Sequence, residues 1–405
     1  MTAPAVAGTA SGVGGRTAAP VRERWRMSPE ALALVVVTAS LQVFGLGVLY
    51  SASALQAVAA GSPGHHFVLR QALGVLVGVV CFMVAAKVDA ERWRPLAWPL
   101  MGLSFLLMLV IILPGTESIS GRVYGSRRYL FGGSIQPSEF AKFAILVWTP
   151  MLLVKKGTGL HRFSNGMLPF GVVIGALCVL AVLEPDLSVA AMFCLLMAVL
   201  LFVGGARLRH FLLFALLGLA GIGAHATQSR YVRARIEGFL VGEAAGKAER
   251  AAVNDQQYQS LVAVGSGGIL GVGFSQGNQQ RGWLPLAYND FIGSIIGEEF
   301  GFLGMVFTIV AFAAYGWLGF RIARHARSPY GTLLAIGLTF TTVFTAFVHL
   351  GVVVRLFPNT GLTLPFVSYG RSNLVLTLLM TGILVNIGSV RERVYGTSAT
   401  DPLGR

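Results

Sequence analysis

A single carboxylate, Asp290, ends the polar stretch 228–290 and stands directly before an apolar run that begins at Phe291. A carboxylate at the edge of an apolar segment can take a proton from an attacking hydroxyl group, which is general base chemistry. The same position also suits an acidic residue that caps a helix N-terminus. Residue type and position therefore leave both capping and catalysis open.

A second group of charges surrounds the start of another apolar run. Arg127 and Arg128 precede Pro137, and Glu139 and Lys142 follow it. Proline favours the first turn of a helix, and an acidic residue there suits the helix dipole. Lys142 follows Glu139 by three residues on the same helix face, so a salt bridge is one interpretation. A functional ion pair in a membrane cleft is the other, because an intramembrane cation costs roughly 2.5–3.5 kcal/mol on insertion scales.

Two further carboxylates, Glu184 and Asp186, flank Pro185 between two apolar runs. Proline ends the preceding helix, so these three residues predict a tight hairpin. The carboxylates could simply cap and solvate the turn, or they could face a ligand.

Glycines and prolines mark two other segments. Within 228–290, arginines such as Arg233 come early, and the glycines between 265 and 273 permit tight re-entrant turns or close backbone approach. These glycines do not form a Walker loop, which needs Gly-Lys-Ser/Thr. In 358–370, two prolines and two glycines predict a broken entry into the last helix, with or without a ligand.

The elements that must position these groups are transmembrane helices. Of the 405 residues, 55% are hydrophobic and only 12% charged, with a mean hydropathy of +0.70; a soluble domain keeps about 25% charged residues. Cys81, Cys178 and Cys194 all lie in apolar runs and indicate no disulfide framework. A spanning helix needs roughly 20 mostly apolar residues. The expected spans are 31–52, 67–87, 95–114, 137–154, 167–184, 187–205, 209–227, 291–320, 332–354 and 364–388.

The distribution of cations predicts the orientation of these spans. With the N-terminus inside, 18 of the 31 lysines and arginines fall in or beside cytoplasmic segments, as the positive-inside rule requires. The net charge of +14 therefore reflects topology signals, and we expect no nucleic-acid partner.

We expect an all-α polytopic protein of the cytoplasmic (inner) membrane with ten transmembrane helices and both termini inside. Residues 1–29 would form a disordered cytoplasmic tail, 30–393 the membrane domain and 394–405 a second cytoplasmic tail. With this orientation the large loop 228–290, between the seventh and eighth helices, would lie outside. A loop of this length usually has a function of its own.

Several motifs of the chain occur in the order typical of the SEDS family, the FtsW/RodA proteins of bacterial cell-wall synthesis. They are GSRRY with QPSEFAK, EPD, YQSLVAVGSGG, LPLAYNDFIGSIIGEE and TGLTLPFVSYG, within about residues 30 to 393. The chain resembles this family, which implies a peptidoglycan glycosyltransferase that polymerises lipid II, with ten helices and a large outer loop. The basic N-terminal tail and the Ser-Gln-Gly-Asn-Gln-Gln stretch at 275–280 favour an FtsW-like over a RodA-like protein.

The resemblance implies that Asp290 is the catalytic residue. The 4-hydroxyl of one GlcNAc would attack the MurNAc C1 of another lipid-linked disaccharide with inversion, and Asp290 would accept the hydroxyl proton. Arg127, Arg128, Lys142 or Arg233 could stabilise the undecaprenyl pyrophosphate leaving group. A divalent cation (Mg or Mn) could share that task, but no spacing establishes one. The substrate-binding residues so implied are Arg127, Arg128, Glu139, Lys142, Asp186, Arg233, Gln259, Ser260, Pro365, Ser368 and Tyr369.

The sequence departs from the usual family residues at a few positions. A usual tryptophan is Tyr129, a usual His-Thr pair is Tyr288-Asn289, a usual asparagine is His349, and a usual glycine and serine are Arg371 and Asn373.

The resemblance also implies a partner, a single-pass class B penicillin-binding protein whose transpeptidase crosslinks the new strands, alongside other divisome or elongasome membrane proteins. Small residues favour helix association in lipid. The predicted docking surface consists of Gly301, Gly304, Ala311, Gly331, Gly337 and Thr341. Internal packing is the alternative role of these small residues. The rival functions are a lipid II flippase or other transporter, and a non-catalytic division scaffold. Transporters tend to place charges at the bilayer midplane, whereas the charges of the motifs here lie near the outer helix ends.

Overall fold

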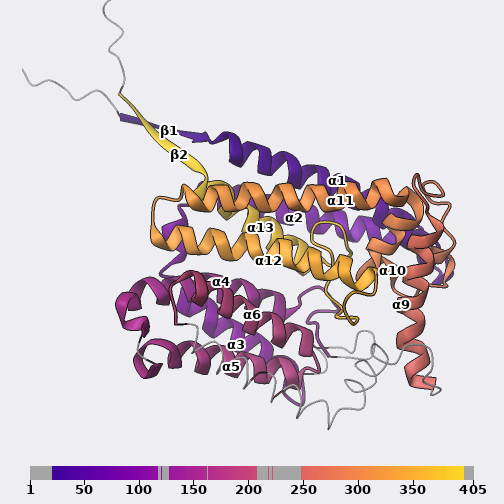
Figure 1. The fold of residues 1–405 in the computed structure, drawn as a ribbon, viewed down its shortest axis with the longest axis horizontal. Helices are drawn as coiled ribbons and strands as arrows, with labels where there is room; N and C mark the ends of the chain where they lie inside the picture. Colours follow the sequence, from indigo (N-terminus) through magenta and orange to yellow (C-terminus); the bar gives the residue numbers. More distant parts are fainter. Residues whose placement is uncertain are drawn as a thin grey trace, which may run out of the picture.

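The structure is a computed structural model, and it describes residues 21–116, 120, 127–161, 163–207, 218, 221 and 248–395. Most of this chain is helical, and the helices run side by side along the long axis of the molecule (Figure 1). The main elements are β1 (Val21–Met27), α1 (Pro29–Ala59), α2 (His66–Lys87), α3 (Ala97–Ile112), α4 (Pro137–Lys156), α5 (Leu168–Leu183), α6 (Leu187–Val203), α9 (Ala248–Ser266), α10 (Ala287–Asp290), α11 (Ile292–Arg324), α12 (Pro329–Val353), α13 (Arg371–Ile387) and β2 (Ser389–Tyr395).

Nine of the ten predicted spans coincide with helices in the described part of the chain. Five helices, α1, α2, α4, α11 and α12, are long and apolar enough to cross a membrane, and α3, α5, α6 and α13 are shorter apolar helices. The remaining predicted span, 209–227, lies outside the described residues except at 218 and 221. The protein is therefore a multi-pass membrane protein.

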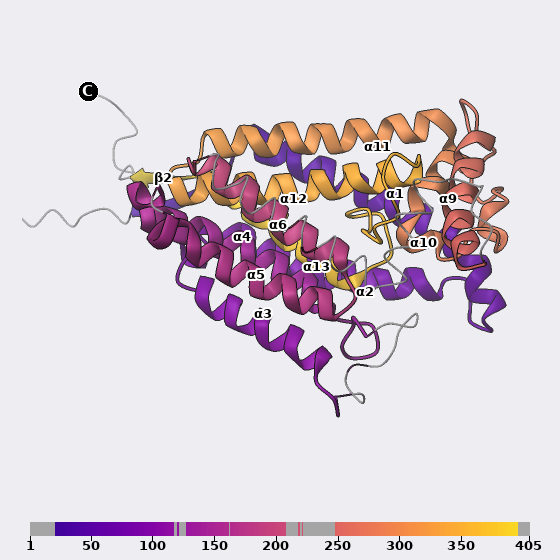
Figure 2. The same ribbon diagram turned by 60° about the horizontal axis from the view of Figure 1, so that its bottom comes forward.

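The helices form two groups. In Figure 1, α1, α2, α11, α12 and α13 lie above α3, α4, α5 and α6, and Figure 2 shows the same groups from a second side. Within the groups, α13 packs along α2 and α11 packs along α12, while α12 joins the groups through α4 and α6. Helices α9 and α10 cover one end of the bundle, and β1 and β2 extend from the other (Figure 1).

Several helices begin at a capping serine or at a proline in the first turn. Ser28 caps α1 by accepting a hydrogen bond from the Ala31 N–H, and Pro29 follows at the first turn. Pro137 opens α4, and Ser328 caps α12. These residues fix where each apolar run starts to be helical.

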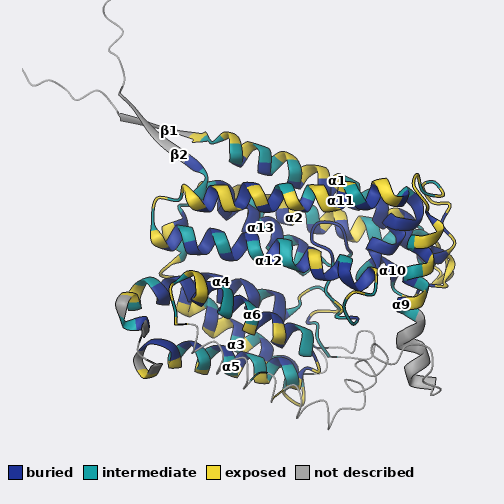
Figure 3. Cartoon of the chain, viewed as in Figure 1, coloured by how far each residue is buried: buried dark blue, intermediate teal, exposed yellow. Residues whose placement is uncertain are grey.

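Burial separates central helices from peripheral ones (Figure 3). Helix α4 is buried along almost its whole length, whereas α2 exposes large apolar side chains such as Leu73 (62%) and Leu76 (63%). A long apolar helix face of this kind suits lipid tails, because a helix satisfies its own backbone hydrogen bonds.

Helix α11 is broken at Gly301, whose φ of 62° favours glycine. The glycine-rich loop after α9 lies against this break. The Val272 and Gly273 N–H groups donate to the Glu298 and Glu299 carbonyls at 3.0 and 3.1 Å. The prediction of tight turns and close backbone approach in 265–273 is confirmed, since Gly268, Gly271 and Gly273 all have positive φ.

Two boundaries differ from the expectation. Residues 21–27, which we expected in a disordered tail, form β1, which pairs antiparallel with β2 and so also gives structure to Val394 and Tyr395. The last span was predicted from residue 364, but α13 begins at Arg371. The positive φ of Phe366 (65°) is one reason why 364–370 cannot continue as a helix.

The predicted docking surface for a partner helix is wrong for most of its residues. A β-carbon on Gly337 would lie 2.8 Å from Leu146 Cδ2 of α4, and Thr341 is also buried. Gly301 faces the backbone of Ile269, and Gly304 faces Ile296 of its own helix. These small residues serve internal packing, where they let helices and loops approach closely.

Candidate functional site

Asp290 is the last residue of α10 and is half-buried. Phe291 occupies the N-cap position of α11 and makes no side-chain cap, so Asp290 is not the cap of that helix. A β-carbon built on Gly361 would lie 3.8 Å from Asp290 Oδ2. The carboxylate therefore faces the segment 358–370, which is the broken helix entry that the sequence predicts.

The backbone on either side of that contact is fixed by Ser368 and Tyr369. The Ser368 hydroxyl donates to the Asn289 carbonyl at 2.7 Å and accepts from the Leu364 N–H at 2.8 Å. The Tyr369 N–H donates to the Tyr288 carbonyl at 3.0 Å. Both residues were predicted to bind substrate. In the structure each bonds to one of the two residues before Asp290.

Gln71 on α2 completes this arrangement, although it was not among the predicted site residues. Its Nε2 donates to the Ser368 carbonyl at 3.0 Å, and its Oε1 accepts from the Gly370 N–H at 3.2 Å. The signal that could have found it is a lone amide inside the apolar run 67–87. A buried amide needs partners for both of its ends.

Arg128 joins two blocks that are far apart in the sequence. Its Nη1 lies 3.4 Å from Asp186 Oδ2, and its Nε and Nη2 donate to the carbonyls of Glu184 (3.3 Å) and Pro185 (2.5 Å). Asp186 also caps α6 by accepting from the Val189 N–H. The hairpin carboxylate therefore both caps a helix and pairs with a cation.

Tyr129 lies close enough to several charged side chains for them to shift its pKa. Burial raises the pKa of Tyr129 well above its ordinary value, the negative charges of Asp290, Glu139 and Asp186 raise it further, and Arg128 opposes them. The charges of Asp290 and of the Arg128–Asp186 pair therefore all act on Tyr129. The phenol stays neutral there and remains a hydrogen-bond donor.

Glu184, in the turn after α5, is a second perturbed group. Burial and the nearby Asp186 charge raise the pKa of Glu184 to about 8, against the opposing effect of Arg128. Its Oε1 is buried and, within the described part of the chain, has no hydrogen-bond partner. A protonated carboxyl group fits these surroundings better than a carboxylate does.

The predicted ion pair between Glu139 and Lys142 is present, with 2.7 Å between Lys142 Nζ and Glu139 Oε1. Both side chains are at least nine-tenths buried, so the pair lies inside the bundle. It borders a cavity of about 10 Å³, room for about one water. The cavity is also lined by Phe143, Thr341, Thr342, Thr345, Pro365, Asn373, Leu376, Thr377 and Met380.

The other predicted substrate-binding residues lie in different surroundings. Arg127 is half-buried beside Arg128, and Gln259 is half-buried on α9. Ser260 is fully buried, and its hydroxyl contacts Ser294 Oγ and the Val353 carbonyl, both at 2.7 Å. Ser260 thus joins α9 to α11 and α12. Arg233 lies outside the described residues.

The departures from the usual family residues also have partners. Arg371 Nη2 donates to Ser134 Oγ at 3.0 Å, and Asn373 Nδ2 donates to Thr363 Oγ1 at 2.5 Å. The Tyr288 ring packs on Phe67, with ring centroids 4.7 Å apart. These contacts link α13 to the loop before α4 and to the segment 358–370, and they link α10 to α2.

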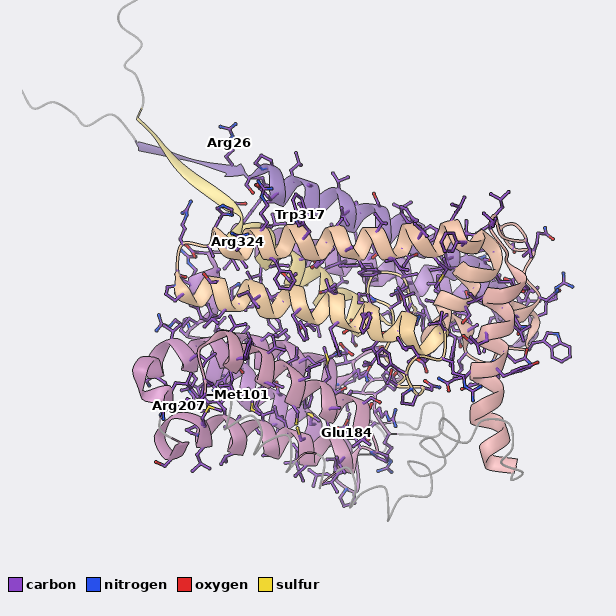
Figure 4. The ribbon with its side chains drawn as sticks, in the orientation of Figure 1. Arg26, Met101, Glu184, Arg207, Trp317 and Arg324 are labelled. Atoms are coloured by element: carbon purple, nitrogen blue, oxygen red, sulfur yellow. The ribbon has the colours of Figure 1, made fainter. Side chains whose placement is uncertain are left out.

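The site lies away from the arginine-rich helix ends. In Figure 4, Arg26, Arg207 and Arg324 lie toward the end that carries β1 and β2, whereas Glu184 lies at the other end of its helix layer. Among the described residues, no group of three or more His, Cys, Asp and Glu side chains could hold a metal ion.

Comparisons with known proteins give consistent matches. A family model described as a cell cycle protein, covering FtsW, RodA and SpoVE, matches residues 31–393. The chain is 35% identical over 371 residues to a probable peptidoglycan glycosyltransferase FtsW of Trichlorobacter lovleyi, covering 91% of this chain and 96% of the relative. It is 35% identical over 365 residues to stage V sporulation protein E of Bacillus subtilis, covering 89% and 97%.

Solved structures share the fold. A chain from work on the structural coordination of polymerization and crosslinking by a peptidoglycan synthase complex matches with a TM-score of 0.70 and 24% identity, covering 88% of this chain and 97% of that one. The rod shape determining protein RodA of Thermus thermophilus matches with a TM-score of 0.61 and 24% identity, covering 88% and 95%.

Proposed function

Because the chain belongs to the FtsW/RodA/SpoVE family of cell cycle proteins, we propose that it is a peptidoglycan glycosyltransferase that polymerises lipid II. The relatives named peptidoglycan glycosyltransferase FtsW support this activity. The structural observation that carries it is a half-buried carboxylate, Asp290, whose charge acts on the buried Tyr129 phenol together with those of Arg128, Glu139 and Asp186.

In the proposed reaction, the 4-hydroxyl of a GlcNAc unit attacks the MurNAc C1 of a second lipid-linked disaccharide. Asp290 accepts the hydroxyl proton, the new glycosidic bond forms with inversion, and the C1–O bond to undecaprenyl pyrophosphate breaks. The hydrogen bonds from Ser368 and Tyr369 to the residues before Asp290 keep this base in place. Fixed geometry of this kind supplies much of the effect of a general base.

Arg127 and Arg128 are the best candidates to stabilise the pyrophosphate leaving group. The Arg128 side chain keeps 25% of its surface exposed and is held at the outer hairpin. Lys142 is a weaker candidate, because it is buried and paired with Glu139. A divalent cation on the pyrophosphate is compatible with the proposal, because carboxylate and phosphate oxygens are the ligands that Mg²⁺ prefers.

We infer that the reaction takes place at the outer face of the inner membrane, as the resemblance to the FtsW/RodA proteins implies. The position of Arg26, Arg207 and Arg324 at the opposite end from Glu184 (Figure 4) supports this orientation, because cations favour the cytoplasmic side. The undecaprenyl chains would lie along exposed apolar helix faces such as that of α2.

A class B penicillin-binding protein is the proposed partner, because a polymerase alone leaves uncrosslinked glycan. The shared fold with a chain studied in a peptidoglycan synthase complex is compatible with such a partner. The relatives named FtsW favour an FtsW-like over a RodA-like protein.

The test is incubation of the purified protein, alone and with its partner, with fluorescent lipid II. A ladder of glycan polymer on gels is the result expected. Translocation of lipid II across vesicle membranes without polymer would instead identify a transporter, and neither product would identify a scaffold.

A further inference from the structure

His349 is fully buried on α12, one turn before the end of that helix. Its ring joins two segments that flank the site. The Gly293 N–H donates to His349 Nε2 at 3.3 Å, and His349 Nδ1 lies 2.8 Å from the Leu362 carbonyl oxygen. Both ring nitrogens therefore have backbone partners.

These partners determine the protonation state of the ring. A backbone N–H can only donate, so Nε2 must carry a lone pair. A carbonyl can only accept, so Nδ1 must carry the proton. Only the neutral Nδ1–H tautomer makes both bonds. The imidazolium form would direct an N–H at the N–H of Gly293.

The two segments that His349 joins are those that set the position of Asp290. Gly293 follows Asp290 by three residues, in the first turn of α11. Leu362 follows Gly361, whose added β-carbon would lie 3.8 Å from Asp290 Oδ2. A β-carbon on Gly293 would lie 3.0 Å from Val353 Cγ2, so α11 and α12 pack closely at this point.

We propose that His349 is a positioning residue for Asp290. Through its two backbone contacts it holds the start of α11 and the 361–362 backbone in register, so that the carboxylate keeps its place opposite that loop. His349 is buried and reaches neither substrate nor the reacting atoms. This inference rests on the proposed function, in which Asp290 is the general base.

The first test compares His349→Leu, His349→Gln and a control, His325→Leu, in the lipid II polymerisation assay with the full-length protein. His325 is exposed at the far end of α11. His349→Leu fills the space of the ring with an apolar side chain and removes both contacts. We expect kcat to fall about 10- to 100-fold, with KM within about twofold of the parent. His349→Gln should recover part of kcat, because an amide supplies one acceptor and one donor. The control should match the parent.

Three results would overturn the inference. They are an unchanged kcat in His349→Leu, a higher KM at unchanged kcat, and His349→Gln as slow as His349→Leu. The second would mean that His349 contributes to substrate binding. The third would mean that only the volume of the ring matters.

A second measurement does not depend on the activity of a variant. Nitrogen NMR of the parent protein with ¹⁵N-labelled histidine reports which ring nitrogen of His349 carries the proton. The His349 signals are assigned by their absence from the spectrum of His349→Gln. We expect the neutral Nδ1–H tautomer of His349. An Nε2–H tautomer or an imidazolium at neutral pH would contradict the bridge.

Asp290→Asn in the same assay separates this inference from the proposed function. A parent protein that makes no polymer, or an active Asp290→Asn, would overturn the proposed function and the inference that rests on it. An inactive Asp290→Asn together with a fully active His349→Leu would overturn the positioning role alone.

Discussion

The Ser368 hydroxyl donates a 2.7 Å hydrogen bond to the carbonyl of Asn289, the residue directly before Asp290. This bond joins the last predicted motif of the chain to the candidate base, although 79 positions separate the two residues. The same hydroxyl accepts from the Leu364 N–H, so one buried side chain connects the folding of 358–370 to the placement of the carboxylate.

Ser368→Ala should therefore lower both activity and stability. The substitution leaves the Asn289 carbonyl and the Leu364 N–H without their partner, and each such buried group costs about 1–3 kcal/mol. Thermal unfolding in detergent and the polymerisation rate would be measured together. Ser40→Ala is the matched control, because Ser40 is exposed and its hydroxyl bonds only to the Val36 carbonyl of its own helix. Equal behaviour of the two variants would argue against the role of Ser368.

Arg128→Ala should reduce polymerisation much more than Arg324→Ala. Arg128 holds the 184–186 hairpin through an ion pair and two carbonyls, whereas Arg324 is exposed at the other end of the bundle (Figure 4). We expect Arg128→Lys to recover little, since a lysine cannot reproduce the fork of donors. The measurement is the polymerisation rate of each purified variant, with its folding checked by size-exclusion chromatography. Similar polymerisation rates for both alanine variants would mean that Arg128 contributes no more to activity than the exposed Arg324.

Glu184 predicts a pH dependence of stability. Its folded-state pKa is raised from 4.5 to about 8, so the folded protein holds this proton more tightly than the unfolded chain. Stability from this group is full below about pH 4.5 and declines as the pH rises towards 8. Glu184→Gln removes this titrating group. The difference in apparent unfolding temperature between the variant and the parent should therefore shift in favour of the variant as the pH is raised from 6 to 9. A difference between the two proteins that does not change with pH would contradict the raised pKa.

Cysteine labelling tests the proposed orientation. In a protein without native cysteines, Leu270→Cys should react with an impermeant maleimide in intact spheroplasts, since Leu270 is 76% exposed near the outer end of α11. His325→Cys, at the opposite end of that helix, should react only after lysis. The reverse pattern would invert the topology inferred from the cation distribution.

Much of the fold follows from the sequence, because apolar runs of about 20 residues have few alternatives to spanning helices. Pro137 marked the start of α4, and the predicted spans from 31 and 332 begin within three residues of α1 and α12. The start of α13 was placed too early. Leu364, Pro365 and Phe366 are as apolar as a helix interior, but the tertiary contacts of Ser368 and Gln71 hold them in a loop.

The site was predictable in residue type but only partly in arrangement. The Glu139–Lys142 pair follows from helical spacing, whereas the contact of Arg128 with Asp186 joins two loops and has no local signal. Gln71 and His349 lie inside apolar runs, where a single polar residue does not show which backbone groups it meets. The small residues of α11 and α12 were read as an outer surface, but helix periodicity does not say which neighbour each face meets.

The most direct test of the account is lipid II polymerisation by Asp290→Asn. Asparagine is nearly isosteric with aspartate but cannot accept the hydroxyl proton, so the variant should insert and unfold like the parent and lose about 100-fold or more of its rate. Asp89→Asn, a carboxylate at the opposite end of α2 and the N-cap of a short 3₁₀ turn, is the control and should stay active. Loss of polymer in Asp290→Asn alone is the predicted result. Near-normal glycan synthesis by that variant would contradict the assignment of Asp290 as the general base.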